Sequence, residues 1–172
     1  MAEADNDSAK FQIFRAKEAP GLMEAGCMTV EPFTPPQREG MNKALEAGYI
    51  GGDEIKVLTD LPGFGLTHVW FKEGYQLPLH SHDADCMYFI ISGSLRLGTE
   101  ELGPRDCFFV PADVPYTYKP GPEGVEVLEI RHANAFNFVN HAKGEAWWIK
   151  AAEEIAIRKD SWKTAKRPVL NG

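Results

Sequence analysis

Residues 74–93 read Gly74-Tyr-Gln-Leu-Pro-Leu-His80-Ser-His82-Asp-Ala-Asp-Cys86-Met-Tyr-Phe-Ile-Ile-Ser-Gly93. Two histidines two positions apart in an extended segment lie on the same face of a strand, because strand side chains alternate with a period of two. Two adjacent imidazoles can chelate a divalent metal ion. An apolar run follows and ends at Ser92-Gly93, which is a turn signal. This stretch therefore predicts a strand that begins at a candidate metal site.

The bulk composition indicates one globular domain. A chain of 172 residues has the length of a single domain and can bury a core. The net charge of -7 argues against non-specific binding of nucleic acid, which requires a basic surface. No apolar run approaches the length of a membrane span. We therefore expect a small-molecule substrate or a protein as partner, with no nucleic acid and no membrane.

The N-terminus and the cysteines predict a cytoplasmic location. The first residues are acidic, whereas a secretory signal starts with positive charge and continues with an apolar core. The three cysteines, Cys27, Cys86 and Cys107, are an odd number without a Cys-x-x-Cys pair. A disulfide framework is therefore not expected, and a reducing compartment fits the sequence.

The middle of the chain has the pattern of many short strands. From residue 51 onward, short apolar runs alternate with turns rich in glycine and proline. This spacing is typical of a sandwich or barrel and not of βαβ units. The predicted strands are 55–58, 66–71, 86–91, 94–97, 107–110, 116–118 and 125–131, with turns between them that include 92–93 and 120–124.

The two flanks differ from this middle part. A short helix is predicted over 37–48, ended by Gly48. The prolines within 31–36 argue against a helix or a central strand there. Near the other end, apolar residues at helical intervals predict a helix over 144–158. The basic residues after it are interpreted as a solvated tail pinned by Trp162.

We therefore divide the chain into three segments. Residues 1–50 are the N-terminal arm and wrapping segments, residues 51–135 the β-barrel, and residues 136–172 the C-terminal helix and basic tail.

A second motif completes a resemblance to a known family. Residues 103–116 read Gly103-Pro-Arg-Asp-Cys-Phe-Phe-Val-Pro111-Ala-Asp113-Val-Pro115-Tyr116. With residues 74–93 they resemble the paired motifs of the cupin superfamily, over roughly residues 55–131. The resemblance implies an all-β fold, a double-stranded β-helix or jelly-roll barrel, with N-terminal wrapping segments and a C-terminal helix. It also implies a homodimer, formed through a barrel face and exchanged N-terminal strands.

The sequence departs from the family pattern at two metal-ligand positions. Cys86 stands where the family carries a glutamate, and it is either a thiolate ligand or a small buried apolar residue. Tyr116 stands where the family carries its third histidine. Its phenol is a metal ligand, a catalytic acid or base, a group that orients substrate, or a core aromatic side chain. Asp113 falls on the glycine of the family's second motif.

Two further histidines are candidates. His132 follows the predicted strand 125–131 and shares one strand face with Leu128 and Ile130. If that apolar face is the interior, His132 replaces the missing third imidazole; otherwise it lies just past the strand end and bonds to backbone. His68 is a weaker candidate for the pocket wall. Aromatic side chains that could line the pocket are Trp70, Phe109 and Tyr118.

The resemblance and the histidine pair together favour a metal-dependent enzyme that acts on a small organic substrate. His80 and His82 would hold a divalent ion, iron before manganese, nickel, copper or zinc, with a third ligand from Tyr116, Cys86 or His132. Open coordination positions allow O2 or substrate to bind the metal, which favours an oxidoreductase, a non-haem dioxygenase. The alternatives are a metal-dependent isomerase or lyase, and a non-catalytic cupin that binds or senses a small molecule. The missing glutamate and histidine favour the binding protein.

Overall fold

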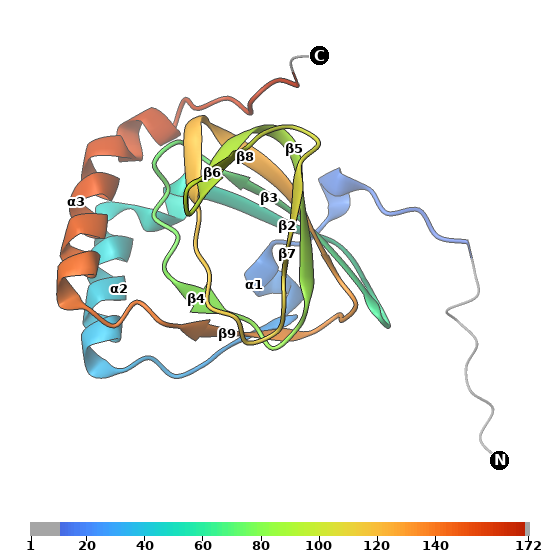
Figure 1. Cartoon of the computed structure of the whole chain (residues 1–172), viewed down its shortest axis with the longest axis horizontal. Helices are drawn as coiled ribbons and strands as arrows, with labels where there is room; N and C mark the ends of the chain where they lie inside the picture. Colours follow the sequence, from blue (N-terminus) through green and yellow to red (C-terminus); the bar gives the residue numbers. More distant parts are fainter. Residues whose placement is uncertain (1–10, 171–172) are drawn as a thin grey trace.

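Two β-sheets form the centre of the protein. The computed structural model describes residues 11–170, so the first ten residues of the predicted arm lie outside it. The larger sheet has six strands in the order β2-β3-β8-β5-β6, with β7 paired to β5 (Figure 1). Its strands are β2 (Asp53–Leu61), β3 (Phe64–Phe71), β5 (Cys86–Leu97), β6 (Glu100–Leu102), β7 (Cys107–Val110) and β8 (Lys119–Arg131).

The smaller sheet joins segments that are far apart in the sequence. It has the order β1-β9-β4, with β1 (Met28–Val30) parallel to β9 (Phe136–Asn140) and β4 (His80–Ser81) antiparallel to it. Its three strands come from the arm, the barrel segment and the C-terminal segment, and β9 was not predicted. The predicted all-β jelly-roll fold with a C-terminal helix is confirmed. Within residues 11–170 its strands form two sheets and not one closed barrel.

Two of the predicted turns are wrong, because the strands continue through them. β5 runs unbroken across residues 92–93, with shifts of register against β8 on both sides of this dipeptide. These shifts mark β-bulges. Gly93 has φ 72°, and a Cβ on it would lie 2.2 Å from the carbonyl oxygen of Gly124. Residues 120–124 likewise belong to β8. The glycines here allow bulges and close approach of two strands.

The helices begin and end close to where they were predicted. Helix α2 (Pro35–Ala47) starts two residues early, because a proline in the first turn needs no N–H partner. The argument against a helix is therefore wrong for Pro35 and Pro36. Gly48 ends the helix with φ 109°, as predicted. Helix α3 (Glu145–Trp162) extends four residues past its predicted end. The short elements are η2 (Ala16–Glu18), α1 (Leu22–Ala25) and η3 (Tyr49–Gly52).

Helices α2 and α3 pack side by side along one flank of the sheets (Figure 1). Trp148 and Ile155 of α3 are buried in this contact. The side-chain amide of Gln37 in α2 donates to the carbonyl of Asn140, at 2.8 Å, and thereby ties the helix pair to β9. No helix within residues 11–170 is both long and apolar enough to cross a membrane.

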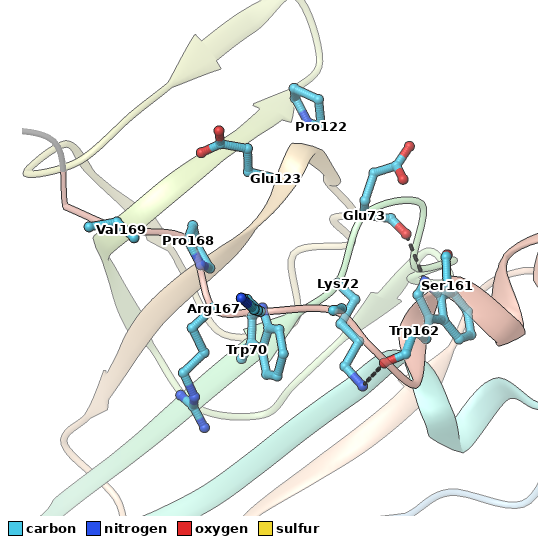
Figure 2. A pocket seen from close by; sticks show the side chains of 12 residues that line it. Trp70, Lys72, Glu73, Pro122, Glu123, Ser161, Trp162, Arg167, Pro168 and Val169 are labelled. Carbon is cyan, nitrogen blue, oxygen red and sulfur yellow. Dashed lines mark hydrogen bonds between the residues drawn. The ribbon is translucent and has the colours of Figure 1, made fainter.

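The C-terminal segment lies against the protein, with most of its side chains after Trp162 exposed to solvent. Figure 2 shows Trp162 at the end of α3, where its indole donates to the Glu73 carbonyl and its own carbonyl accepts from Lys72. Further along, Arg167 contacts Glu54 and Glu126, each at 2.5 Å. Trp162 therefore pins the segment as predicted, and the ion pairs of Arg167 hold it on the outer face of the larger sheet.

The contact between α2 and α3 depends on one glycine. A Cβ on Gly40 would lie 2.2 Å from Cγ and 2.5 Å from Cβ of Trp148, atoms that cannot move without shifting α3. We expect Gly40→Ala to lower the free energy of unfolding by about 1–3 kcal/mol through overpacking, despite the better helix propensity of alanine. Urea unfolding measures this change.

Gly103→Ala is the matched control, because nothing lies within 4 Å of a Cβ at that position. Equal stability of the Gly40→Ala variant and the control would contradict the packing that the structure shows.

Candidate functional site

A cavity of about 590 Å³ lies between the two sheets. The larger sheet contributes side chains from β2, β3 and β8, and the smaller sheet contributes β1, β4 and β9. Apolar side chains of α1, α2 and η3 also line it. The polar and aromatic side chains that line it are Glu24, Phe33, Tyr49, Asp53, Phe71, Tyr75, His80, His82, Tyr116, Tyr118, Glu129, Arg131, Phe136 and Phe138.

The two sequence motifs are joined at this cavity by backbone hydrogen bonds. The N–H of His80 donates to the carbonyl of Tyr116 at 3.1 Å, and the N–H of Tyr116 donates back at 2.9 Å. Asp113 donates its N–H to the carbonyl of His82 at 2.7 Å. Asp113 has φ 62°, a left-handed conformation that explains why the family carries glycine there. The predicted strand 116–118 is thus reduced to a single bridge at Tyr116.

His80 and His82 are buried side by side as neutral imidazoles. Their ring centroids are 5.0 Å apart. Nδ1 of His80 lies 2.8 Å from the carbonyl oxygen of Pro78, and Nδ1 of His82 lies 2.5 Å from that of Asn137. Since a carbonyl only accepts, Nδ1 carries the proton and Nε2 keeps its lone pair. Burial is the main cause that lowers the pKa of both rings to about 4. The neighbouring His82 lowers the pKa of His80 further, and the charge of Arg131 lowers that of His82 further.

Cys86 and Tyr116 are held in their protonated forms. Burial, and next the charge of Glu129, raise the pKa of the Cys86 thiol to about 12. The same two causes raise the pKa of Tyr116, whose hydroxyl forms a very short hydrogen bond with that of Tyr88. Tyr116 lies beside His80, with ring centroids 4.4 Å apart, and lines the cavity. Cys86 is 2% exposed and is not among the side chains that form the cavity wall within residues 11–170.

Strand β8 turns the face of Glu129 and Arg131 to the cavity, and not the apolar face of Leu128 and Ile130. Glu129 and Arg131 line the cavity, whereas Ile130 points outward and is 38% exposed. His132 is exposed, and its ring lies near Gly63 in the turn between β2 and β3. The face of β8 that His132 shares with Ile130 is therefore not the interior, and His132 does not replace the third imidazole. In place of an apolar wall, β8 supplies an ion pair, with Nη1 of Arg131 2.8 Å from the Glu129 carboxylate.

The other predicted wall residues divide between the two faces of the sheet. Tyr118 lines the cavity. His68 lies on the outer face, where Nε2 is 3.2 Å from the Glu126 carboxylate, and Trp70 lies there too, near Arg167. Phe109 is 53% exposed. The expectation that His68, Trp70 and Phe109 line the pocket is therefore wrong.

Sequence reasoning missed several cavity residues. Phe136 and Phe138 belong to the unpredicted β9, and alternation of aromatic with polar residues was the available signal. Glu129 and Arg131 were not among the candidate residues. The available signal was that Glu129 and Arg131 lie on the same strand face as Val125 and Val127, because every second residue of a strand points to the same side. Both valines are fully buried. The four residues occupy the same face as Tyr88 and Ile90 of the neighbouring strand β5.

The imidazole pair fits a metal ion, whereas the rest of the expected ligand set does not. An ion about 2 Å from each Nε2 would place the two ring centroids roughly 5 Å apart, which is close to the observed distance. Both Nδ1 atoms are bound to carbonyls, the arrangement that orients metal-binding histidines. Within residues 11–170, however, no three His, Cys, Asp or Glu side chains are placed to share one ion.

Comparison with known proteins gives fold-level similarity only. No family model and no curated protein matches the chain. Among solved structures, the polyketide cyclase RemF from Streptomyces resistomycificus is 21% identical, with a TM-score of 0.47, covering 60% of this chain and 84% of that chain. An RmlC-like cupin from Shewanella frigidimarina is 21% identical, with a TM-score of 0.42, covering 47% and 76%. Salicylate 1,2-dioxygenase from Pseudoaminobacter salicylatoxidans, in adducts with gentisate, is 12% identical, with a TM-score of 0.47, covering 62% and 35%.

The class of protein is defined by the fold and by the position of its motifs. The order of the strands, the cavity between the two sheets, and the docking of residues 74–93 on residues 103–116 are those of a cupin fold. Two of the similar structures are described as an RmlC-like cupin and as a protein with a cupin-like fold. A fold does not by itself determine a reaction.

The low pKa values of the histidines predict an acid sensitivity. In metal-free protein, the pKa of about 4 for His80 and His82 lies below the ordinary value of 6.5, so the unfolded chain binds more protons between these values. The free energy of unfolding is therefore not reduced by these histidines above pH 6.5, and it falls as the pH is lowered from 6.5 towards 4. We expect a loss of about 3 kcal/mol per histidine, measured by urea unfolding across this range.

His82→Asn keeps a donor near the position of Nδ1 and does not titrate, so its stability should depend less steeply on pH than that of the wild type. His132→Asn, at an exposed position, is the control and should keep the wild-type slope. An unchanged slope in His82→Asn would contradict the assignment of a depressed pKa to His82.

Proposed function

We propose that the protein is a metal-dependent cupin enzyme that acts on a small organic substrate in the cavity between the sheets. His80 and His82 would hold a divalent ion, most readily iron, with manganese, nickel, copper and zinc as alternatives. The observation that carries the proposal is the pair of buried, neutral imidazoles with their Nδ1 atoms bound to carbonyls. Burial that keeps histidine neutral also keeps the Nε2 lone pairs available to a metal.

The chemistry favoured for such a site is dioxygenation. An ion with only two protein ligands keeps open positions at which O2 or substrate can coordinate, as in non-haem iron oxygenases. Tyr116 is the residue of this chain best placed to act beside the ion, since it contacts His80 and lines the cavity. Because its hydroxyl is protonated and bonded to Tyr88, it would orient substrate or donate a proton.

A specific observation favours the runner-up, a cupin that binds or senses a small molecule without reaction. The third histidine and the glutamate of the family pattern are absent. Their replacements Tyr116 and Cys86 hold their protons, so neither is a strong ligand in this environment. Metal-dependent isomerisation or lyase chemistry is the second alternative, and it requires the metal but no oxygen.

Metal content separates these functions. Protein purified without a histidine tag and supplied with each ion in turn should hold close to one ion per chain by elemental analysis. His80→Ala and His82→Ala should each lose it, because a single remaining imidazole is a weak site. His132→Ala is the matched control, since that exposed histidine faces away from the cavity and its loss should leave the metal content unchanged.

Absence of metal from the wild type with every ion would leave the binding protein as the function. If the ion binds, oxygen uptake by the iron-loaded protein with a panel of aromatic and enolisable compounds tests dioxygenation. Conversion of a compound without oxygen uptake would instead identify the isomerase or lyase.

We further propose that the protein forms a homodimer through the outer face of the larger sheet. Phe109, Met87 and Ile130 lie in one row across β7, β5 and β8, because Met87 pairs with the other two. All three are more than a third exposed, and Phe11 and Ile13 of the arm are 91% and 65% exposed. Apolar side chains concentrated on one sheet face are typical of an interaction surface.

Light scattering after gel filtration should therefore give twice the chain mass of 19.1 kDa. We expect Phe109→Lys to give the monomer mass, because it places a charge in the apolar row. Ile157→Lys, at a 77% exposed position on α3, should leave the dimer intact. A monomeric wild type would refute the proposed dimer.

A further inference from the structure

Arg131 is a buried cation whose hydrogen-bonding capacity is only partly used. The side chain is 3% exposed and lines the cavity. Nη1 contacts the carboxylate of Glu129 at 2.8 Å, and the guanidinium carbon lies 4.0 Å from the centroid of the Phe136 ring. Nε and Nη2 have no hydrogen-bond partner in the part of the chain that the structure describes. Buried donors of a cation rarely remain unpaired, because each loses its hydration without compensation.

The two unpaired atoms form a complete binding edge. In a guanidinium group, the N–H of Nε and one N–H of Nη2 point in the same direction and match the two oxygens of a carboxylate. The Glu129 contact uses the other terminal nitrogen, so this edge is left intact. Arginine is the side chain best suited to such bidentate recognition, and a second carboxylate is the group whose shape fits.

The remainder of the cavity is suited to an apolar body. Its wall includes the buried side chains of Val69 and Phe71, and also Met23 and Ile50, which are 76% and 74% exposed and so lie at the surface. Tyr118 adds a hydroxyl that is buried without a hydrogen-bond partner within residues 11–170. A ligand with a charged head and an apolar body would thus find a partner for each part of the cavity.

We propose that the cavity binds organic carboxylates, with a shift of the Arg131 side chain bringing its buried Nε–Nη2 edge to the carboxylate and an apolar or aromatic body extending towards Met23 and Ile50. This inference rests on the proposed function for its biological meaning, since it names the substrate class of the same site. Glu129 opposes the binding, because it places a negative charge on the other side of the same guanidinium group. The anchor is therefore weaker than an unshared arginine, and removal of the Glu129 charge strengthens it.

The test compares an acid with its neutral isostere. Calorimetric titration of 3-phenylpropanoate and 3-phenylpropanamide is carried out on chelator-treated protein, so that the result does not depend on a metal. We expect the acid to bind at least about tenfold more tightly than the amide, as for a charge-assisted bidentate hydrogen bond. Arg131→Met should abolish this preference, and Arg96→Met, at an exposed position on β5, should retain it.

Arg131→Met leaves Glu129 buried without its partner, so its folding is checked by circular dichroism. Glu129→Gln provides an independent arm in which the acid should bind several-fold more tightly than in the wild type, with the amide unaffected. The inference is overturned if the wild type shows no preference for the acid, including no binding of either compound. It is also overturned if the preference survives in folded Arg131→Met, or if Glu129→Gln does not strengthen binding of the acid.

The result is separable from that of the metal experiment. Preference for the acid in a protein that holds no metal would remove the proposed enzyme and leave the carboxylate site. A protein that holds one metal ion per chain but shows no preference for the acid would keep the proposed enzyme and remove the carboxylate site.

Discussion

The ion pair between Glu129 and Arg131 is the constraint on which the interior depends. Two charges placed between β-sheets are expensive to bury and persist only when they are paired closely. The Phe136 ring packs against Arg131, so the pair also connects the larger sheet to the smaller one. Burial is the main cause of the low pKa of His82 and of the high pKa of Cys86, and the charges of the pair add to both shifts. Arg131 helps to lower the pKa of His82, and Glu129 helps to raise that of Cys86.

The parts of the structure that local sequence determines could be predicted. The i, i+2 spacing of His80 and His82 fixes their common face whatever surrounds them, and the structure places both at the cavity. Asp113 could be aligned with the glycine of the family motif, and it adopts the conformation that glycine would take. The end of helix α2 at Gly48 is determined by a left-handed residue in the same way.

The parts that depend on distant partners could not be predicted. Between residues 125 and 131 both faces of the strand carry two aliphatic residues, so alternation alone does not say which face is interior. The interior face is the one on which Phe136 of β9 packs against Arg131, and the partners of β9 are β1 and β4, far away in the sequence. The turn predicted at 92–93 failed for a related reason, because Gly93 serves the close approach of Gly124 from another strand. Short-range patterns cannot distinguish a glycine that ends a strand from one that accommodates a neighbouring strand.

The charges in the cavity connect the two proposals made for it. A divalent ion on His80 and His82 would bring two positive charges into an interior where Glu129 is already neutralised by Arg131. Without an ion, Cys86 and Tyr116 both hold their protons and supply no negative charge. A carboxylate ligand on Arg131 would supply one. Coupling between two binding events is reciprocal. If the bound anion raises the affinity of the cavity for the metal ion, the bound ion must raise the affinity for the anion by the same factor. A site with few protein ligands would then bind its ion more tightly when the organic anion is also bound.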